Sequence, residues 1–189
     1  MKTAVVSRHH PLLVTLHWLL AVLIIAMLCI GFVVLAPMPN TDPRKIGILL
    51  VHMSVGMAIL ALMVARFIVR IRTSRPADAT TGYPLLDRLA RITHYGFYVL
   101  VVLMVGSGYA TAILAGLNKS VFQGSGDPLP PDFSIYPTFV AHGTLAALLA
   151  GFIVVHILAA LFHQFVLKDR LLRRMLFGQR GPTSSAQVK

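Results

Sequence analysis

The chain has 189 residues, of which 57% are hydrophobic and only 12% are charged. Because a soluble domain averages roughly 25% charged residues, this composition excludes an ordinary soluble enzyme and indicates an integral membrane protein. The net charge of +11 would suggest nucleic-acid binding in a soluble protein. Beside membrane spans, basic residues instead set the topology and contact anionic lipid, so we expect membrane lipid and no nucleic acid as partner.

Four apolar segments are long enough to cross a bilayer as helices, which takes about 20 residues each. In chain order they cover residues 12–36, 46–70, 91–115 and 138–167. Pro11 fits the first turn of the first helix, and Pro37 and Pro39 stop that helix. We therefore predict an all-α fold, in which residues 1–189 form one integral membrane domain built as a four-helix bundle.

The connections between the spans differ in length and in charge. Residues 73–90 are expected to form a loop, and residues 116–137 form the longest connection, which is rich in glycine and proline. Loops of this length are usually functional or disordered. With the N-terminus in the cytoplasm, 14 of the 17 basic residues lie on the cytoplasmic side, which leaves Arg44, Lys45 and Lys119 outside. Because basic residues stay inside, both termini are predicted to be cytoplasmic and the loop 116–137 periplasmic.

Six of the eight histidines lie within the predicted spans or at their ends. They are His17, His52, His94, His142, His156 and His163. Ionisable residues inside a membrane are rare and by default mark a functional site. His142, His156 and His163 follow one another at intervals of 14 and 7 residues, which return to nearly the same helix face. His142 and His156 are roughly 21 Å apart along the axis, so they belong to two separate sites.

The depth of each histidine in its span suggests which residues are partners. His52 and His142 lie at a similar depth from the outer face, so these two are expected to meet. His17 lies near the inner face, and its partner is either His156 or His163. Depth alone slightly favours His163, because His156 lies deeper.

Two imidazoles that face each other across a helix bundle are typical of heme ligation. Small residues close to these histidines, among them Gly56, Gly143 and Gly151, would make room for the macrocycle. Cys29 is the only cysteine, so covalent attachment through a pair of cysteines is excluded and b-type heme is expected. A zinc site is disfavoured, because the spans contain no Asp or Glu and no histidine pair at i, i+3 or i, i+4.

The order of these motifs resembles the bacterial cytochrome b561 family, over nearly the whole chain. The matching segments are Leu16–Leu19, Val51–Gly56, Arg66, Ala141–Ala146, His156–His163 and Lys168–Met175. The resemblance implies two heme b groups per chain. It also implies that His17 pairs with His156 and His52 with His142, which leaves His163 outside the ligand set.

Within that family the chain most resembles the superoxide oxidases. The resemblance implies a multi-pass oxidoreductase of the bacterial inner membrane that passes electrons from periplasmic superoxide to ubiquinone. Arg44, Lys45 and Lys119 are then predicted to steer the superoxide anion towards the outer site. His94 and His163 are predicted on the quinone side, since histidine can deliver protons near neutral pH. His9 and His10 precede the first span and are interpreted as solvated.

Two alternatives remain, one within redox chemistry and one from a different functional class. The chain could be a quinone-linked cytochrome b that accepts electrons from a periplasmic redox protein, with the long loop 116–137 as the docking surface. It could also be a small membrane transporter or structural protein without heme. The second alternative is disfavoured, because transporters of protons or metal ions usually need carboxylates inside the membrane and these spans have none.

Overall fold

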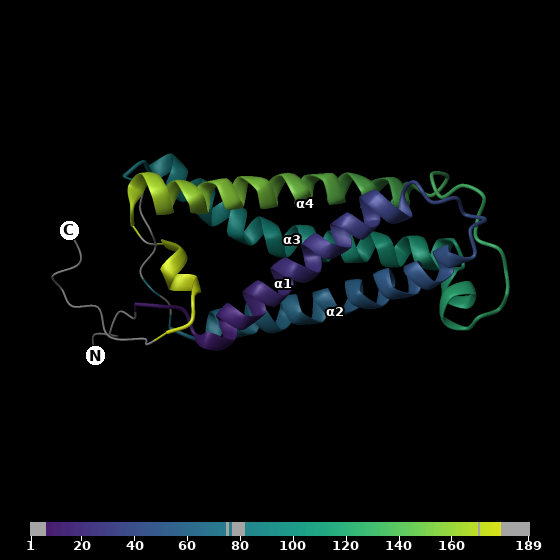
Figure 1. The fold of residues 1–189 in the computed structure, drawn as a ribbon, viewed down its shortest axis with the longest axis horizontal. Helices are drawn as coiled ribbons and strands as arrows, with labels where there is room; N and C mark the ends of the chain where they lie inside the picture. The colour runs from purple at the N-terminus through teal and green to yellow at the C-terminus, as the bar shows by residue number, and fades with distance from the viewer. Residues whose placement is uncertain (1–6, 75, 77–81, 170, 179–189) are drawn as a thin grey trace.

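The computed structural model describes residues 7–74, 76, 82–169 and 171–178, and within these residues it contains four long helices (Figure 1). Their bounds are Pro11–Cys29 for α1, Arg44–Arg72 for α2, Pro84–Leu114 for α3 and Pro137–Phe162 for α4. Short π-helical segments continue α1 over Ile30–Leu35 and α4 over His163–Leu167. All four helices are long and apolar enough to cross a membrane, which agrees with the prediction of an all-α fold with four long apolar helices.

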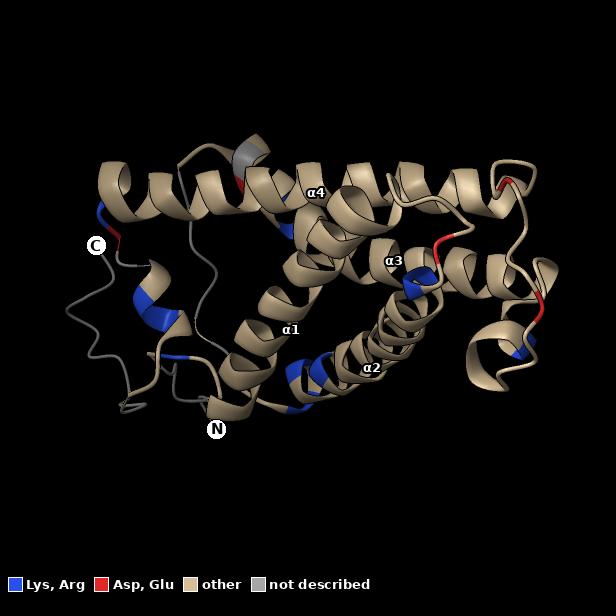
Figure 2. Ribbon diagram, turned by 45° about the vertical axis from the view of Figure 1, so that its right-hand side comes forward, with Lys and Arg blue, Asp and Glu red and all other residues tan. Residues whose placement is uncertain are grey.

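The helices alternate in direction along the bundle. In Figure 1, α1 begins and α4 ends at one end, which we call the terminal end. The opposite end, which we call the loop end, holds the α1–α2 and α3–α4 connections. Arg44, Lys45 and Lys119 lie on elements of the loop end, while most other described lysines and arginines lie towards the terminal end (Figure 2).

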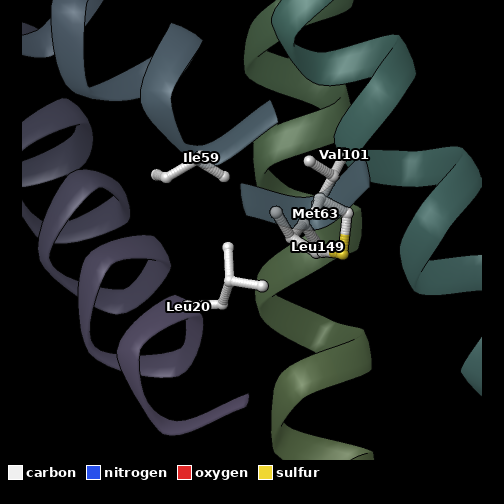
Figure 3. Packing of buried hydrophobic residues seen from close by; sticks show 5 residues of the cluster. All are labelled: Leu20, Ile59, Met63, Val101 and Leu149. Carbon is white, nitrogen blue, oxygen red and sulfur yellow. The ribbon is translucent and has the colours of Figure 1, made fainter. Parts of the chain in front are cut away.

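A single apolar layer from all four helices forms the middle of the bundle. Its buried members are Leu20, Ile59, Met63, Val101 and Leu149 (Figure 3). Leu149 lies seven residues from both His142 and His156, so the layer lies about 10 Å along α4 from each of them. Outside the core, apolar side chains such as Val33, at 71% exposure, and Leu158, at 59%, cover the surface. Such faces suit lipid rather than water.

Helix α3 begins seven residues earlier than predicted, so residues 84–90 of the expected loop are helical. Pro84 occupies its first turn, where the missing N–H is not needed. Asp87 lies in the same turn, where its negative charge interacts favourably with the positive end of the helix dipole. Arg88 and Arg91 interrupt the apolar pattern of this region, which is why hydropathy placed the start too late.

The α3–α4 connection is packed rather than extended. It includes the π-helical segment Asn118–Phe122 and a small core made by Ala112, Leu117, Val121, Leu129 and Phe133. Asn40 of the α1–α2 connection donates through Nδ2 to the carbonyl oxygen of Pro130, at 2.6 Å. The two loops are therefore bound together over the loop end.

Candidate functional site: two histidine pairs

The first histidine pair lies towards the loop end, between α2 and α4. The rings of His52 and His142 have centroids 6.2 Å apart and planes at 74°. Nδ1 of His142 lies 2.9 Å from the carbonyl oxygen of Met104, and a protonated Nδ1 that donates to it leaves Nε2 with a free lone pair. Nδ1 of His52 is buried and has no hydrogen-bond partner among the described residues.

The second pair lies towards the terminal end, between α1 and α4. The ring centroids of His17 and His156 are 6.3 Å apart, with planes at 71°. Two residues of α3 pack on the same ring of His156: His94 at 5.6 Å and Phe97 at 5.4 Å between centroids. Nη2 of Arg66 lies 3.5 Å from Nδ1 of His17.

Both separations fit a metal held between two imidazoles. A metal–imidazole bond of about 2.0–2.1 Å puts the ring centroid about 3 Å from the metal, so two opposed imidazoles have centroids about 6 Å apart. The observed values of 6.2 and 6.3 Å match this spacing. No cluster of three or more metal-ligating side chains occurs in the described part of the chain. The donor set therefore fits two axial ligands of a heme iron better than a zinc ion.

The remaining two intramembrane histidines lie in different surroundings. His94 touches the ring of His156, and its Nδ1 lies 2.7 Å from the carbonyl oxygen of Ala90. His163 is buried in the π-helical end of α4, where its Nδ1 lies 2.5 Å from Oδ2 of Asp169. Sequence reasoning missed this carboxylate partner, although the close sequence neighbours His163 and Asp169 were a visible signal.

The three loop-end cations are not equally exposed. Lys119 is exposed. Arg44 is exposed but paired with Asp42 at 2.7 Å, and hydrogen bonds from Arg44 lower the pKa of Asp42 to about 2. Lys45 is only 5% exposed, and its Nζ donates to the carbonyl oxygen of Met38 and to Oδ1 of Asn40. Lys45 thus binds within the α1–α2 connection, where little of its side chain is open to solvent.

The interpretation of His9 as solvated was wrong. Residues 171–178 fold back over the terminal end, and the backbone N–H of His9 donates to the carbonyl oxygen of Arg174 at 3.2 Å. Burial, together with Arg70 and Arg66, lowers the pKa of His9 to about 4. His10 caps α1, because its Nδ1 accepts a hydrogen bond from the backbone N–H of Leu12.

Residues 8–178 match the family described as prokaryotic cytochrome b561. The chain belongs to this family. This cytochrome is 32% identical over 181 residues to the probable superoxide oxidase CybB of Yersinia pestis, which covers 93% of this chain and 99% of that protein. It is 30% identical over 167 residues to cytochrome b562 of Cereibacter sphaeroides, covering 86% and 91% of the two chains. Identity to cytochrome b561 homolog 2 of Escherichia coli is 27% over 173 residues, covering 90% and 92%.

These findings confirm the predicted family, and family membership implies heme b and a role in electron transport. With four helices that could span a membrane, the chain is a prokaryotic membrane cytochrome. The alternative of a heme-free transporter or structural protein is therefore set aside.

A close approach of α3 to His142 leads to a first prediction. A Cβ at Gly108 would lie 2.9 Å from Cε1 of His142, whereas a Cβ at Gly106 would meet nothing within 4 Å. Alanine favours a helix over glycine, so Gly108→Ala should not weaken α3. The substitution should act only by displacing the imidazole ring of His142. We expect Gly108→Ala to reduce the heme retained at the loop end, seen as a smaller α-band in reduced-minus-oxidised spectra. Gly106→Ala is the control, and identical spectra for the two variants would contradict the prediction.

Proposed function

We propose that this cytochrome binds two heme b groups and moves electrons between the two faces of the membrane. One heme would be held by His52 and His142, the other by His17 and His156. The observation that supports this best is the repetition of the same imidazole separation, 6.2 and 6.3 Å, at two depths of one helix. Heme held by these histidines would supply reversible one-electron transfer.

We further propose that the terminal end faces the cytoplasm of a bacterial cell and the loop end faces the periplasm. The distribution of basic residues supports this orientation, since lysine and arginine collect on the cytoplasmic side of short loops. Among the described residues, the lysines and arginines on elements of the loop end are Arg44, Lys45 and Lys119. This orientation puts the His52–His142 pair near the periplasm and the His17–His156 pair near the cytoplasm.

The proposed reaction is the oxidation of superoxide with reduction of ubiquinone. Two superoxide anions each lose one electron and become dioxygen, while one quinone takes up two electrons and two protons to become quinol. The 32% identity to a protein named a probable superoxide oxidase supports this substrate. Lys119 and Arg44 would attract the anion to the loop end; the contribution of Arg44 is reduced by its partner Asp42.

Quinone reduction also needs protons at the terminal end. The His163–Asp169 pair is suited to this task, because a carboxylate orients the imidazole and histidine exchanges protons near neutral pH. His94 is the second proposed quinone-side residue, and its contact with His156 would keep it beside the proposed heme ligand. Both assignments depend on the cytoplasmic position of the terminal end.

Superoxide consumption by the purified cytochrome with added ubiquinone tests the proposed substrate. We expect Lys119→Gln to slow the reaction a few-fold at low ionic strength, and the difference should shrink at high salt, because steering of a charged substrate is screened. Arg91→Gln, an exposed charge at the other end, is the control and should leave the rate unchanged. Superoxide consumption no faster than that of a heme-free preparation would rule out the proposed reaction.

The second candidate function is electron transfer from a periplasmic redox protein. The α3–α4 connection exposes large apolar side chains, with Phe122 at 51% and Ile135 at 67% exposure, and such side chains are enriched where proteins dock. If superoxide is not consumed but a reduced periplasmic fraction reduces the purified cytochrome, this second function replaces the first.

A further inference from the structure

Arg66 is a buried cation without a protein anion. Its side chain lies on α2 and is 8% exposed, and its Nη1 has no hydrogen-bond partner. No described carboxylate lies within ion-pair distance of it; the ion pairs found among the described residues are Arg44–Asp42 and His163–Asp169. A buried guanidinium with an unused donor is strongly unfavourable unless a partner compensates its charge.

Two other unpartnered polar atoms lie in the same region. The hydroxyl of Tyr98 on α3 and Nδ1 of His9 are buried without a hydrogen-bond partner, and both residues interact electrostatically with Arg66. Phe67, the neighbour of Arg66 on α2, packs against the ring of Tyr98 at 5.2 Å between centroids. Arg66, Tyr98 and His9, from separate parts of the chain, thus each have a buried polar atom without a partner, and Arg66 interacts electrostatically with the other two.

The chemistry of this cluster favours an anionic acceptor. The guanidinium and the tyrosine hydroxyl can both donate, and Arg70 and Arg174 add positive charge close to His9. A carboxylate matches the guanidinium fork with two parallel hydrogen bonds and also neutralises its charge. A quinone carbonyl would accept a hydrogen bond but would leave the charge uncompensated.

The source of the carboxylate follows from the position of Arg66. Its Nη2 lies 3.5 Å from the ring of His17, so a group bound there is adjacent to the His17–His156 pair. Heme b carries two propionate side chains, which end in carboxylates. We propose that Arg66, assisted by the hydroxyl of Tyr98, binds a propionate of the heme held at the terminal end. This inference rests on the proposed heme site between His17 and His156.

The test compares heme with its dimethyl ester, which lacks the two carboxylates. Wild type and Arg66→Gln are stripped of heme and refilled with either form, and retention at the terminal-end site is followed by absorbance. We expect Arg66→Gln to weaken retention of heme by about tenfold or more, and to change retention of the ester by less than about twofold. Arg66→Lys keeps the positive charge but loses the forked pair of donors. Its retention of heme should therefore lie between that of wild type and that of Arg66→Gln. Arg72→Gln, which removes an exposed cation further along α2, is the control.

Several outcomes would overturn the inference. Equal weakening of heme and its ester would show that Arg66 supports the fold, and unchanged retention of both would show that Arg66 touches neither. A raised KM for ubiquinone with normal heme retention would assign Arg66 to a quinone instead. If the terminal-end variant His17→Ala retains both hemes, the proposed function fails first, and this result is separate from any effect of Arg66. Should Arg66→Gln not fold, a potentiometric titration of Arg66→Lys decides: the midpoint of one heme should shift and that of the other should stay.

Discussion

The variant His142→Ala is expected to lose one of two heme b groups and to keep the other. His142 is opposed by His52 across 6.2 Å, and no other histidine ring contacts it among the described residues. The second pair lies beyond the apolar layer around Leu149, about 21 Å away along α4, so it should remain intact. The α-band of the reduced protein should fall to about half, and His52→Ala should give the same spectrum because one axial ligand is missing in either case.

The selectivity of this loss is the informative part. Thr144→Ala, two residues further along α4 and exposed, is a matched control that should retain both hemes. Potentiometric titration of His142→Ala should show one midpoint in place of two. Loss of both hemes in a folded His142→Ala, or of neither, would contradict the assignment of separate sites.

His17→Ala is expected to remove the other heme, while His163→Ala keeps both. His17 is opposed by His156 at 6.3 Å, whereas the Nδ1 of His163 is bound to Asp169. The two variants remove the same side chain near the same end of the bundle, so each serves as the control of the other. We expect His17→Ala to lower superoxide-dependent quinone reduction to background, and His163→Ala to slow only the step that needs protons.

Heme content and pH dependence separate the two roles. In His163→Ala the heme spectrum should be normal, and quinone reduction should lose most at high pH, where water supplies few protons. Loss of the same heme in both His17→Ala and His163→Ala would contradict these roles and would restore the pairing of His17 with His163 that depth alone slightly favours.

Hydropathy and depth predicted the helices and one histidine pair well, because both depend on position along a single helix. The match of His52 with His142 depends on how many residues separate each histidine from the loop end of its helix, and this number can be counted in the sequence. The partner of His17 could not be obtained in this way. Helix α1 crosses the bundle diagonally in Figure 1, so equal counts of residues along α1 and α4 do not correspond to equal depth.

Contacts between distant segments were the part that the sequence could not predict. Lys45 is buried because the α1–α2 connection folds over its ammonium, and Asn40 then binds the backbone of the α3–α4 connection. His9 is half-buried because residues 171–178 return to α1, where Nε1 of Trp18 donates to the carbonyl oxygen of Met175 at 2.8 Å. Neither arrangement leaves a pattern in the local sequence, because each depends on packing between segments that are far apart in the chain.

Quantitation of heme in the purified protein tests the diheme assignment most directly. The dithionite-reduced spectrum, followed by the pyridine hemochromogen assay against protein concentration, gives the type and number of hemes per chain. We predict two heme b groups per chain, with the α-band of b-type heme. One heme per chain, or none despite an ample heme supply during expression, would contradict the assignment of His17, His52, His142 and His156 as two ligand pairs.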